Sequence, residues 1–393
     1  MDATGAEIWT RQFGGTDAEF GNSITRVGPG SIAVGGMTLG MLPMQTSLGD
    51  GDGFVRLYDD AGAEMWTRQL GTSRYDEIYA LAADQLGHIY ATGRTNGSFP
   101  GHVNAGQEDV FILQLDAATG ATNWARQFGT SSREYAFALG VDALGNVFAG
   151  GSTGGALSTQ ANAGGQDAFL MKLDVSGALQ WVRQFGTSGL DRVYAVAVDD
   201  GGNVIAGGFS GTGEVRKFDS QGRAVWTKQF EPGASVEAVS FGNAGQIVVA
   251  GGVSGALPGQ TSFGASDGFV RLLLSDGTTL MTQQFGTAAP DYVRGVAINT
   301  LGQIYVSGQT DGTFPGQTSA GNIDAFVFEA VIPEPASTGL IAVGALGLLA
   351  QLRPRGAGLS SPSSREVAKG IEQAGKPAAT SAARRGGHRP ASR

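Results

Sequence analysis

The chain has 393 residues, of which 65 are glycine, and only 16% of the residues are charged. Glycine does not recur at every third position and 41% of the residues are hydrophobic, which excludes a collagen-like helix and a wholly disordered chain. Cysteine is absent and there are three histidines, so disulfides and thiolate chemistry are excluded and a multi-histidine metal site has almost no ligands to draw on.

One short string repeats along the chain. Trp9-Thr-Arg-Gln-Phe-Gly returns at Trp66, Trp124, Trp181 and Trp226, and Met281 takes the tryptophan place in a further copy. Between these anchors, apolar runs rich in Val, Ile, Tyr and Phe alternate with turns that contain Gly, Asp or Asn. Such runs predict short strands joined by tight turns, and four strands in each unit predict the blade of a β-propeller.

The repeat predicts six blades in an all-β propeller domain at residues 2–330. Five units are complete, at residues 17–71, 74–129, 133–186, 191–230 and 235–286, and a sixth at 291–329 has three strands. Residues 2–14 have the sequence of the missing strand. We therefore predict that Ile8–Phe13 pairs with Ala325–Phe328 and closes the ring of four-stranded blades. The alternative is a larger propeller that has been cut short at its start.

The distribution of side-chain size fits this geometry. Blades crowd near the axis and spread toward the rim, so the inner strands carry small residues such as Gly150 and Gly207. The last strand of each unit carries the tryptophan, which fills the wider outer gap. An arginine lies two residues after it in four copies, and we expect these arginines to contact the tryptophans rather than a ligand: Arg11, Arg68, Arg126 and Arg183.

These strings resemble a known repeat family. Trp-x-Arg-Gln-Phe-Gly-Thr-Ser, Asp-x-x-Gly-Asn-Val and Phe-Pro-Gly-Gln-Thr together look like the SBBP β-propeller repeat of bacterial exported proteins, over about residues 2–330. Members of that family are named for seven blades, whereas six are counted in this sequence. The resemblance implies a propeller fold and no established catalytic residue.

The carboxyl end resembles a second family signal. Pro333-Glu334-Pro335 is followed by the apolar segment 336–352 and then by Arg353 and Arg355, an order similar to the PEP-CTERM sorting signal at 333–355. The resemblance implies export in a Gram-negative bacterium, recognition by a membrane exosortase, and anchoring until processing. Residues 336–352 would form a transmembrane helix of about 25 Å, and the alternative is a helix packed on the propeller.

Both ends of the chain depart from this pattern. Residues 356–393 continue beyond the arginines, and their Ser-, Ala-, Gly- and Arg-rich composition predicts a disordered basic tail. Met1 begins inside a repeat and no apolar leader follows it, so we expect the natural start to lie upstream.

The net charge and the recurrent acidic residues of the propeller region bear on nucleic-acid and metal binding. The propeller region carries a net charge of −15, which argues against nucleic-acid binding. Acidic residues recur before the first strand and before the third strand of the units, and we interpret them first as stabilising turns. The first set is Asp17, Asp76, Glu134, Asp191 and Asp291. The second set is Asp52, Asp109, Asp167, Asp267 and Asp324, with Thr212 at this position in the shortened fourth unit. The alternative is Ca²⁺ binding, for which Asp50 and Asp52 are the best candidates.

Nothing in the sequence identifies a catalytic or cofactor-binding residue. The segment Asp116-Ala-Ala-Thr-Gly-Ala-Thr-Asn-Trp124 resembles the tryptophan-docking motif of quinoprotein propellers, which implies that it locks blades together. We predict a non-catalytic, exported surface or matrix scaffold that binds polysaccharide or protein. The binding face would carry exposed aromatic residues on the long loops, with a notch at Ser210–Gly213: loops 38–52, 95–108, 153–166, 254–267 and 311–323. The alternative is an envelope lyase, hydrolase or quinoprotein-like enzyme that uses the central opening.

Overall fold

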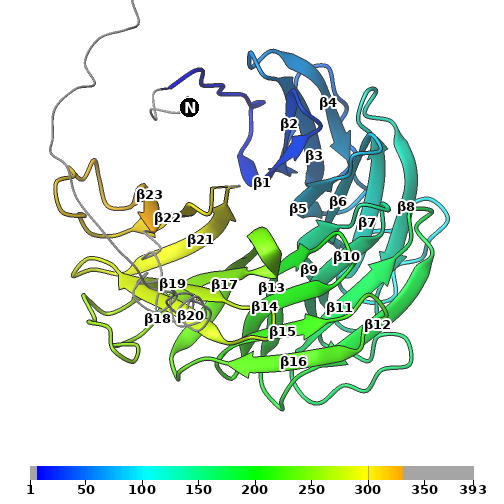
Figure 1. Cartoon of the computed structure of the whole chain (residues 1–393). Helices are drawn as coiled ribbons and strands as arrows, with labels where there is room; N and C mark the ends of the chain where they lie inside the picture. Colours follow the sequence, from blue (N-terminus) through cyan, green and yellow to red (C-terminus); the bar gives the residue numbers. More distant parts are fainter. Residues whose placement is uncertain (1–6, 300, 331–393) are drawn as a thin grey trace, which may run out of the picture. The chain divides into compact units, whose positions relative to one another are not determined.

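The computed structural model describes residues 7–299 and 301–330, which form six antiparallel sheets arranged in chain order around a common centre (Figure 1). The prediction of an all-β, six-bladed propeller is confirmed. In the described part of the chain the helical structure is one turn, η1 (Asn243–Gly245). No helix in that part is long and apolar enough to cross a membrane. The predicted helix 336–352, the sorting residues of 333–355 and the tail 356–393 lie outside the described residues.

Each sheet is a meander in which consecutive strands pair. The first three blades are β1 (Glu19–Val27), β2 (Ser31–Thr38), β3 (Asp52–Asp59) and β4 (Glu64–Leu70); β5 (Asp76–Ala83), β6 (His88–Thr95), β7 (Asp109–Asp116) and β8 (Thr122–Phe128); and β9 (Glu134–Val141), β10 (Val147–Thr153), β11 (Asp167–Leu173) and β12 (Leu179–Phe185). The last three blades are β13 (Asp191–Val198), β14 (Val204–Ser210), β15 (Gly213–Phe218) and β16 (Ala224–Gln229); β17 (Ala234–Phe241), β18 (Ile247–Val253), β19 (Asp267–Leu273) and β20 (Thr279–Phe285); and β21 (Asp291–Ile298), β22 (Ile304–Thr310) and β23 (Asp324–Ala330).

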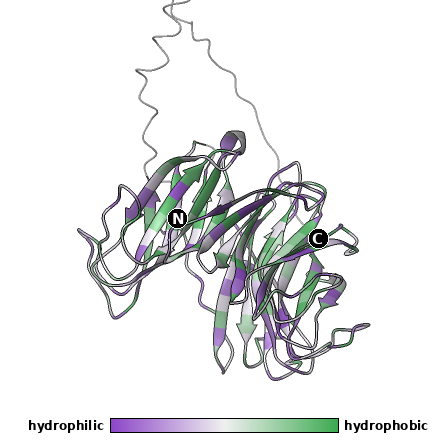
Figure 2. Cartoon of the chain, turned by 90° about the horizontal axis from the view of Figure 1, so that it is seen from below, coloured by the Kyte–Doolittle hydropathy of each residue, from purple (hydrophilic) through white to green (hydrophobic). Residues whose placement is uncertain are grey.

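The hydrophobic core lies between the blades. Figure 2 shows hydrophobic residues along the strands of the sheets. The third strand of four blades carries a phenylalanine at the same place, and each of these rings is at most 1% exposed: Phe54, Phe111, Phe169 and Phe269. Blades two to five bury both faces of their sheets against their neighbours, so stability is expected to arise joint by joint along the chain.

The predicted closure of the ring by the amino-terminal segment is wrong in the structure. The sixth sheet has three strands, and residues 7–14, although described, form no strand and do not pair with β23. The segment is held on its other side, against blade one, where Phe13 contacts Phe54 at 5.5 Å between ring centroids. Closure also brings together the parts of the propeller that are most distant in sequence, which carries the largest loop-closure cost.

Candidate functional site

Five tryptophans fasten an outer strand, or the amino-terminal segment, to the next blade. The indole N–H donates to a backbone carbonyl in the turn between the third and fourth strands of the following blade, at 2.9–3.3 Å in five places: Trp9 to Asp60, Trp66 to Ala117, Trp124 to Val175, Trp181 to Ser220 and Trp226 to Ser275. The amino-terminal segment therefore makes the same contact as a complete outer strand.

The arginine two residues later strengthens this contact. The Nε–H of Arg126 donates to the Gly177 carbonyl at 2.8 Å, and Arg183 donates to Gly222 in the same way at 2.7 Å. The guanidinium carbons of the four arginines lie 5.4–5.8 Å from the tryptophan ring of the same strand, which confirms the predicted contact. These side chains hold the blades together and are not free to bind a ligand.

The segment from Asp116 to Trp124 also stabilises a turn and a contact between blades. Asp116 accepts hydrogen bonds from the backbone N–H and the hydroxyl of Thr119, at 2.8 and 2.6 Å, and so fixes the turn. These two bonds lower the pKa of Asp116, the hydroxyl bond contributing most. Trp124 then docks on the third blade. The motif fixes a turn and a blade contact, in agreement with the locking role that its resemblance implies.

A β-bulge at the same point of all six innermost strands builds the candidate site. One residue of each strand is left out of the pairing register: Asn22, Tyr79, Phe137, Tyr194, Glu237 and Arg294. Opposite each bulge lies a glycine, and a Cβ there would come within 1.7–2.1 Å of a backbone carbonyl oxygen: Gly36, Gly93, Gly151, Gly208, Gly251 and Gly308. Bulges redirect side chains, so we call these six bulged residues the bulge ring.

Three aromatic members of the bulge ring meet across three blades. Phe137 lies 5.4 Å from Tyr79 and 5.9 Å from Tyr194, measured between ring centroids. Tyr135 stacks on Phe137 at 5.8 Å with an interplanar angle of 11°. We name Tyr79, Tyr135, Phe137 and Tyr194 the aromatic arc. Its ring faces are half-buried and converge from neighbouring strands, an arrangement that suits a flat or ring-shaped ligand.

Charged groups border the aromatic arc. Arg94 forms an ion pair with Glu77 at 3.0 Å and lies over the rings of Tyr75 and Tyr135 at 4.8 and 5.6 Å. Burial, with the nearby Glu77 carboxylate, raises the pKa of Tyr79 far above its ordinary value, so this phenol stays protonated at neutral pH. The arc therefore offers hydroxyl groups beside apolar ring faces.

Two cavities open beside this region. One of about 350 Å³ is lined by Asp50, Arg74, Tyr75, Arg94 and Asn96. The other, of about 270 Å³, lies between blades five and six, and Glu237, Tyr292 and Arg294 are among its lining residues. Burial raises the pKa of Glu237, while a hydrogen bond with Ser235 and the charge of Arg294 oppose the rise.

The two carboxylates predicted to bind Ca²⁺ have different surroundings. Asp50 is exposed and shares its cavity with Arg74 and Arg94. Asp52 is fully buried, and its Oδ2 accepts hydrogen bonds from the Leu48 N–H at 2.8 Å and the Gln69 side chain at 2.7 Å. Residues 7–299 and 301–330 contain no group of three or more His, Asp or Glu side chains placed to hold a metal ion. Calcium binding by Asp50 and Asp52 stays a prediction.

The recurrent acids do stabilise turns, with one correction. Asp76 accepts the Thr72 N–H at 2.6 Å, and Glu134 accepts the Thr130 N–H at 2.7 Å. In blade one this position belongs to Glu19, which accepts the Gly15 N–H at 3.0 Å, and not to Asp17. Glu19 lies ten residues after Trp9, as Asp76 does after Trp66, whereas Asp17 lies two residues too early, and the pairing of Glu19 with Thr38 fixes the register.

The side chains of Phe99 and Leu257 on the long loops are buried, which corrects the expectation that they are exposed, whereas Phe263 on another part of these loops is 50% exposed. Phe99 is 6% exposed and contacts Phe111 at 5.1 Å, while Leu257 is 1% exposed. The loop amides are also occupied: Gln160 and Gln260 accept backbone N–H groups of the outer strands. The signal that sequence reading missed is the residue before the small position of each inner strand, which becomes the bulge.

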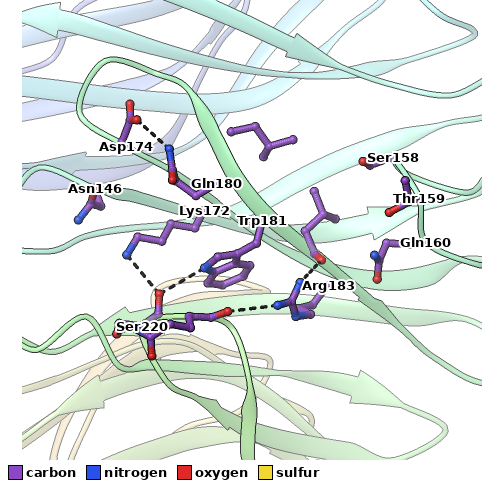
Figure 3. A pocket seen from close by; sticks show the side chains of 13 residues that line it. Asn146, Ser158, Thr159, Gln160, Lys172, Asp174, Gln180, Trp181, Arg183 and Ser220 are labelled. Carbon is purple, nitrogen blue, oxygen red and sulfur yellow. Dashed lines mark hydrogen bonds between the residues drawn. The ribbon is translucent and has the colours of Figure 1, made fainter.

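A polar groove of about 660 Å³ runs along the rim between blades three and four (Figure 3). Figure 3 shows Trp181 and Lys172 both directed at the Ser220 carbonyl, to which they donate at 3.3 Å. Arg183 donates to the Gln221 carbonyl at 3.1 Å. The cationic side chains of the groove are therefore engaged in holding the two blades together.

The chain is a β-propeller repeat protein. The model of the SBBP β-propeller repeat family matches residues 66–100, which run from the docking tryptophan of blade one into the long loop of blade two. The chain is 24% identical over 345 residues to the regulatory protein FlaEY of Caulobacter vibrioides, a match that covers 83% of this chain. It spans about one third (34%) of the length of that relative.

Two solved structures are similar to the chain at low sequence identity. BamB from Moraxella catarrhalis is 16% identical, with a TM-score of 0.38, over 73% of this chain and 82% of that one. Virginiamycin B lyase from Staphylococcus aureus is 9% identical, with a TM-score of 0.42, over 78% of this chain and 83% of that one.

Proposed function

We propose that the protein is a non-catalytic binding scaffold of the cell envelope or extracellular matrix, and that the aromatic arc and its charged border bind a polysaccharide. The observation that carries this proposal is the convergence of Tyr79, Phe137 and Tyr194 from three blades, each placed by a bulge. Aromatic faces stack on the apolar faces of sugar rings, and protonated tyrosines and Arg94 offer hydrogen bonds to sugar hydroxyls.

The rigidity of the blade joints supports a binding role. Four of the five tryptophan contacts come from full outer strands, so the arc is built on elements that are held in place from both sides. A preformed surface loses little conformational entropy when it binds, which favours affinity.

A glycan array with the full chain tests the proposal. We expect binding to a class of polysaccharide, and we expect Tyr194→Ala to weaken that binding about tenfold, the equivalent of one lost aromatic contact. Phe263→Ala is the matched control, because Phe263 is a half-exposed aromatic residue on a loop and makes no part of the arc. Binding that is equal in both variants would place the site elsewhere.

For the envelope location, the proposal rests on the sequence at 333–355, with an exosortase as the partner that recognises it. A chain with Pro333, Glu334 and Pro335 all changed to alanine should accumulate unprocessed in the membrane fraction, while the parent chain is processed. Identical processing of the two chains would remove this part of the proposal.

One observation favours a second candidate, an enzyme acting at the central opening. Glu237, with its raised pKa, lines the 270 Å³ cavity together with Tyr292 and Arg294, and a buried acid beside a cation is an arrangement used in acid–base catalysis. A screen against polysaccharide lyase and hydrolase substrates, repeated with Glu237→Gln, distinguishes the two functions. Turnover that disappears in that variant would establish the enzyme.

A further inference from the structure

Two sets of acids meet in pairs at the joints between blades. Asp52, at the start of β3, faces Asp76, at the start of the first strand of the next blade. The same pairing occurs at three other joints: Asp109 with Glu134, Asp167 with Asp191, and Asp267 with Asp291. All eight residues are at most 1% exposed. Burying two carboxylates side by side is costly unless a cation or a proton neutralises part of their charge.

Each pair leaves a buried oxygen without a partner. At the first joint, the donors described above reach only Oδ2 of Asp52, and Oδ1 makes no hydrogen bond. Oδ1 is unpartnered in the same way in three further residues: Asp109, Asp167 and Asp267. An unpaired buried oxygen that recurs at four joints indicates a missing donor.

A glycine makes room for the two acids at three of the joints. A Cβ on Gly71 would lie 3.0 Å from Oδ1 of Asp52 and 2.7 Å from Oδ2 of Asp76, so both carboxyl groups reach the same small space. Gly186 and Gly286 have the two acids of their own joints within 2.7–2.9 Å in the same way. The unpartnered Oδ1 of Asp52 and its equivalents at these joints therefore face the same small space as the neighbouring acid.

The joint between blades four and five shows that the two acids act as a unit. There, Thr212 replaces the acid of the third strand and Ala234 replaces the acid of the first strand. The glycine is replaced at the same joint by Glu231, whose carboxylate pairs with Arg271 at 2.7 Å. Both acids and the glycine are lost together, and a separate ion pair appears.

We propose that the two carboxyl groups at each of the four joints share one proton, as a carboxylic acid whose O–H donates to the unpartnered oxygen of the neighbouring carboxylate. The proton comes from solvent, and its loss leaves two facing carboxylates with no donor between them. Each joint offers two acids, and the described part of the chain contains no cluster of three or more ligands for a metal ion, so a proton fits the site better than a cation.

The groups that face the pairs support this assignment. Burial raises the pKa of Asp76 and the charge of Asp52 adds to the rise, while hydrogen bonds from Thr95 and Thr72 oppose it. Burial likewise raises the pKa of Glu134 and Asp109 adds to the rise, while Thr130 and Thr153 oppose it. The interactions that favour ionisation come from hydroxyl and backbone N–H groups.

These directions fix the sign of the pH dependence. The pKa of a joint acid is higher in the folded chain than its ordinary value of 3.8 for Asp76 or 4.5 for Glu134. The stability that the shared proton contributes is fully present below those ordinary values and is lost as pH rises through the folded values. The joints should therefore loosen as the medium becomes less acidic.

Infrared spectroscopy of the full chain tests the proposal directly. We expect the carbonyl stretch of protonated carboxyl groups to persist at about pH 6, where ordinary Asp and Glu side chains are ionised. The band should shrink in the double variant Asp76→Asn, Glu134→Gln. A wild-type spectrum at that pH with no protonated carboxyl band overturns the proposal, whatever the variants do.

The pH dependence of the melting temperature is an independent test of the shared proton. In Asp76→Asn the side chain keeps its size but can no longer lose a proton, so the variant should fold and its melting temperature should depend less on pH between about pH 5 and pH 8. Asp174→Asn removes the same charge from a turn and should leave that dependence unchanged. A melting temperature that falls with a chelator and recovers with Ca²⁺ would assign the joints to a cation and overturn the shared proton.

Discussion

The joint between blades one and two and the place where the amino-terminal segment meets blade one share the same tryptophan contact, but only the first also includes a paired outer strand. Trp66 and Trp9 donate the same hydrogen bond at the same distance of 2.9 Å, each to the turn of the following blade. Trp66, however, lies on β4, which also pairs with β3, whereas the segment around Trp9 pairs with no strand in the described residues. Docking of a tryptophan on the next blade and strand pairing within a blade therefore contribute separately to the stability of a joint.

The two places also differ in how well they bury apolar surface. Leu81 of β5 packs against Gly35 of blade one, at 2.8 Å from a Cβ built there. Ile24 holds the equivalent position in β1 and is 65% exposed, and Val327 of β23 is 72% exposed. The side chains that would fill a sixth joint are present, but they are not buried against each other. The comparison can be tested by removing equivalent groups from the two places.

The largest contrast is expected for the tryptophans. Trp66→Ala removes an 8% exposed side chain from a complete joint and should lower the free energy of unfolding by about 3–5 kcal/mol. Trp9→Ala removes a less buried ring from an unpaired segment and should cost about 1–2 kcal/mol. Chemical denaturation of both variants measures the difference. Equal losses would mean that the amino-terminal segment is as fully integrated as β4.

Alanine at a bulge glycine should have the next largest effect. In Gly93→Ala the new Cβ would lie 1.8 Å from the Glu77 carbonyl oxygen, so the bulge and the side chain of Tyr79 must shift. We expect a loss of about 3 kcal/mol, as for a strongly overpacked site. Gly21→Ala is the control, since nothing lies within 4 Å of its Cβ position. Similar melting temperatures for the two variants would contradict the role assigned to the bulge.

Sequence patterns predicted the number of blades and the arginine–tryptophan contacts because both depend on a repeat of fixed length. The bulge ring was missed, since alternation along Asp76–Ala83 does not show that Tyr79 is left out of the pairing and only the comparison of all six units marks the residue before the small position. Glycine abundance was attributed to crowding near the axis, which holds for Gly35 and Gly150, whereas Gly93 and its equivalents are required by the bulge. Exposure of the loop aromatics failed as a prediction because Phe99 packs on its own blade.

A smaller effect is expected at the arginine of the blade contact, where the chain supplies its own comparison. Lys228 replaces the arginine in blade four, and its Nζ donates to the Gly277 carbonyl at 3.1 Å. Arg126→Lys should therefore keep one of the hydrogen bonds and cost less than about 1 kcal/mol, while Arg126→Ala should cost about 1–2 kcal/mol. Differential scanning calorimetry of the two variants measures which of them loses more stability. A lysine variant as unstable as the alanine variant would show that the guanidinium contact with Trp124 dominates.

The smallest expected effect has the opposite pH dependence to that of the blade joints. A hydrogen bond from the Ser176 hydroxyl, with further bonds from the Ala178 and Ser176 backbone N–H groups, lowers the pKa of the Asp174 carboxyl in its turn. A pKa that is lower in the folded chain gives stability that is present above the ordinary value of 3.8 and is lost as pH falls through the folded value. Asp174→Asn should therefore lower the melting temperature slightly at neutral pH and flatten its decline in acid. Because the paired acids of the joints lose stability toward high pH, removing the turn acids one at a time should move the pH of maximum stability downward. An upward movement of the pH of maximum stability would contradict the lowered pKa assigned to the turn acids.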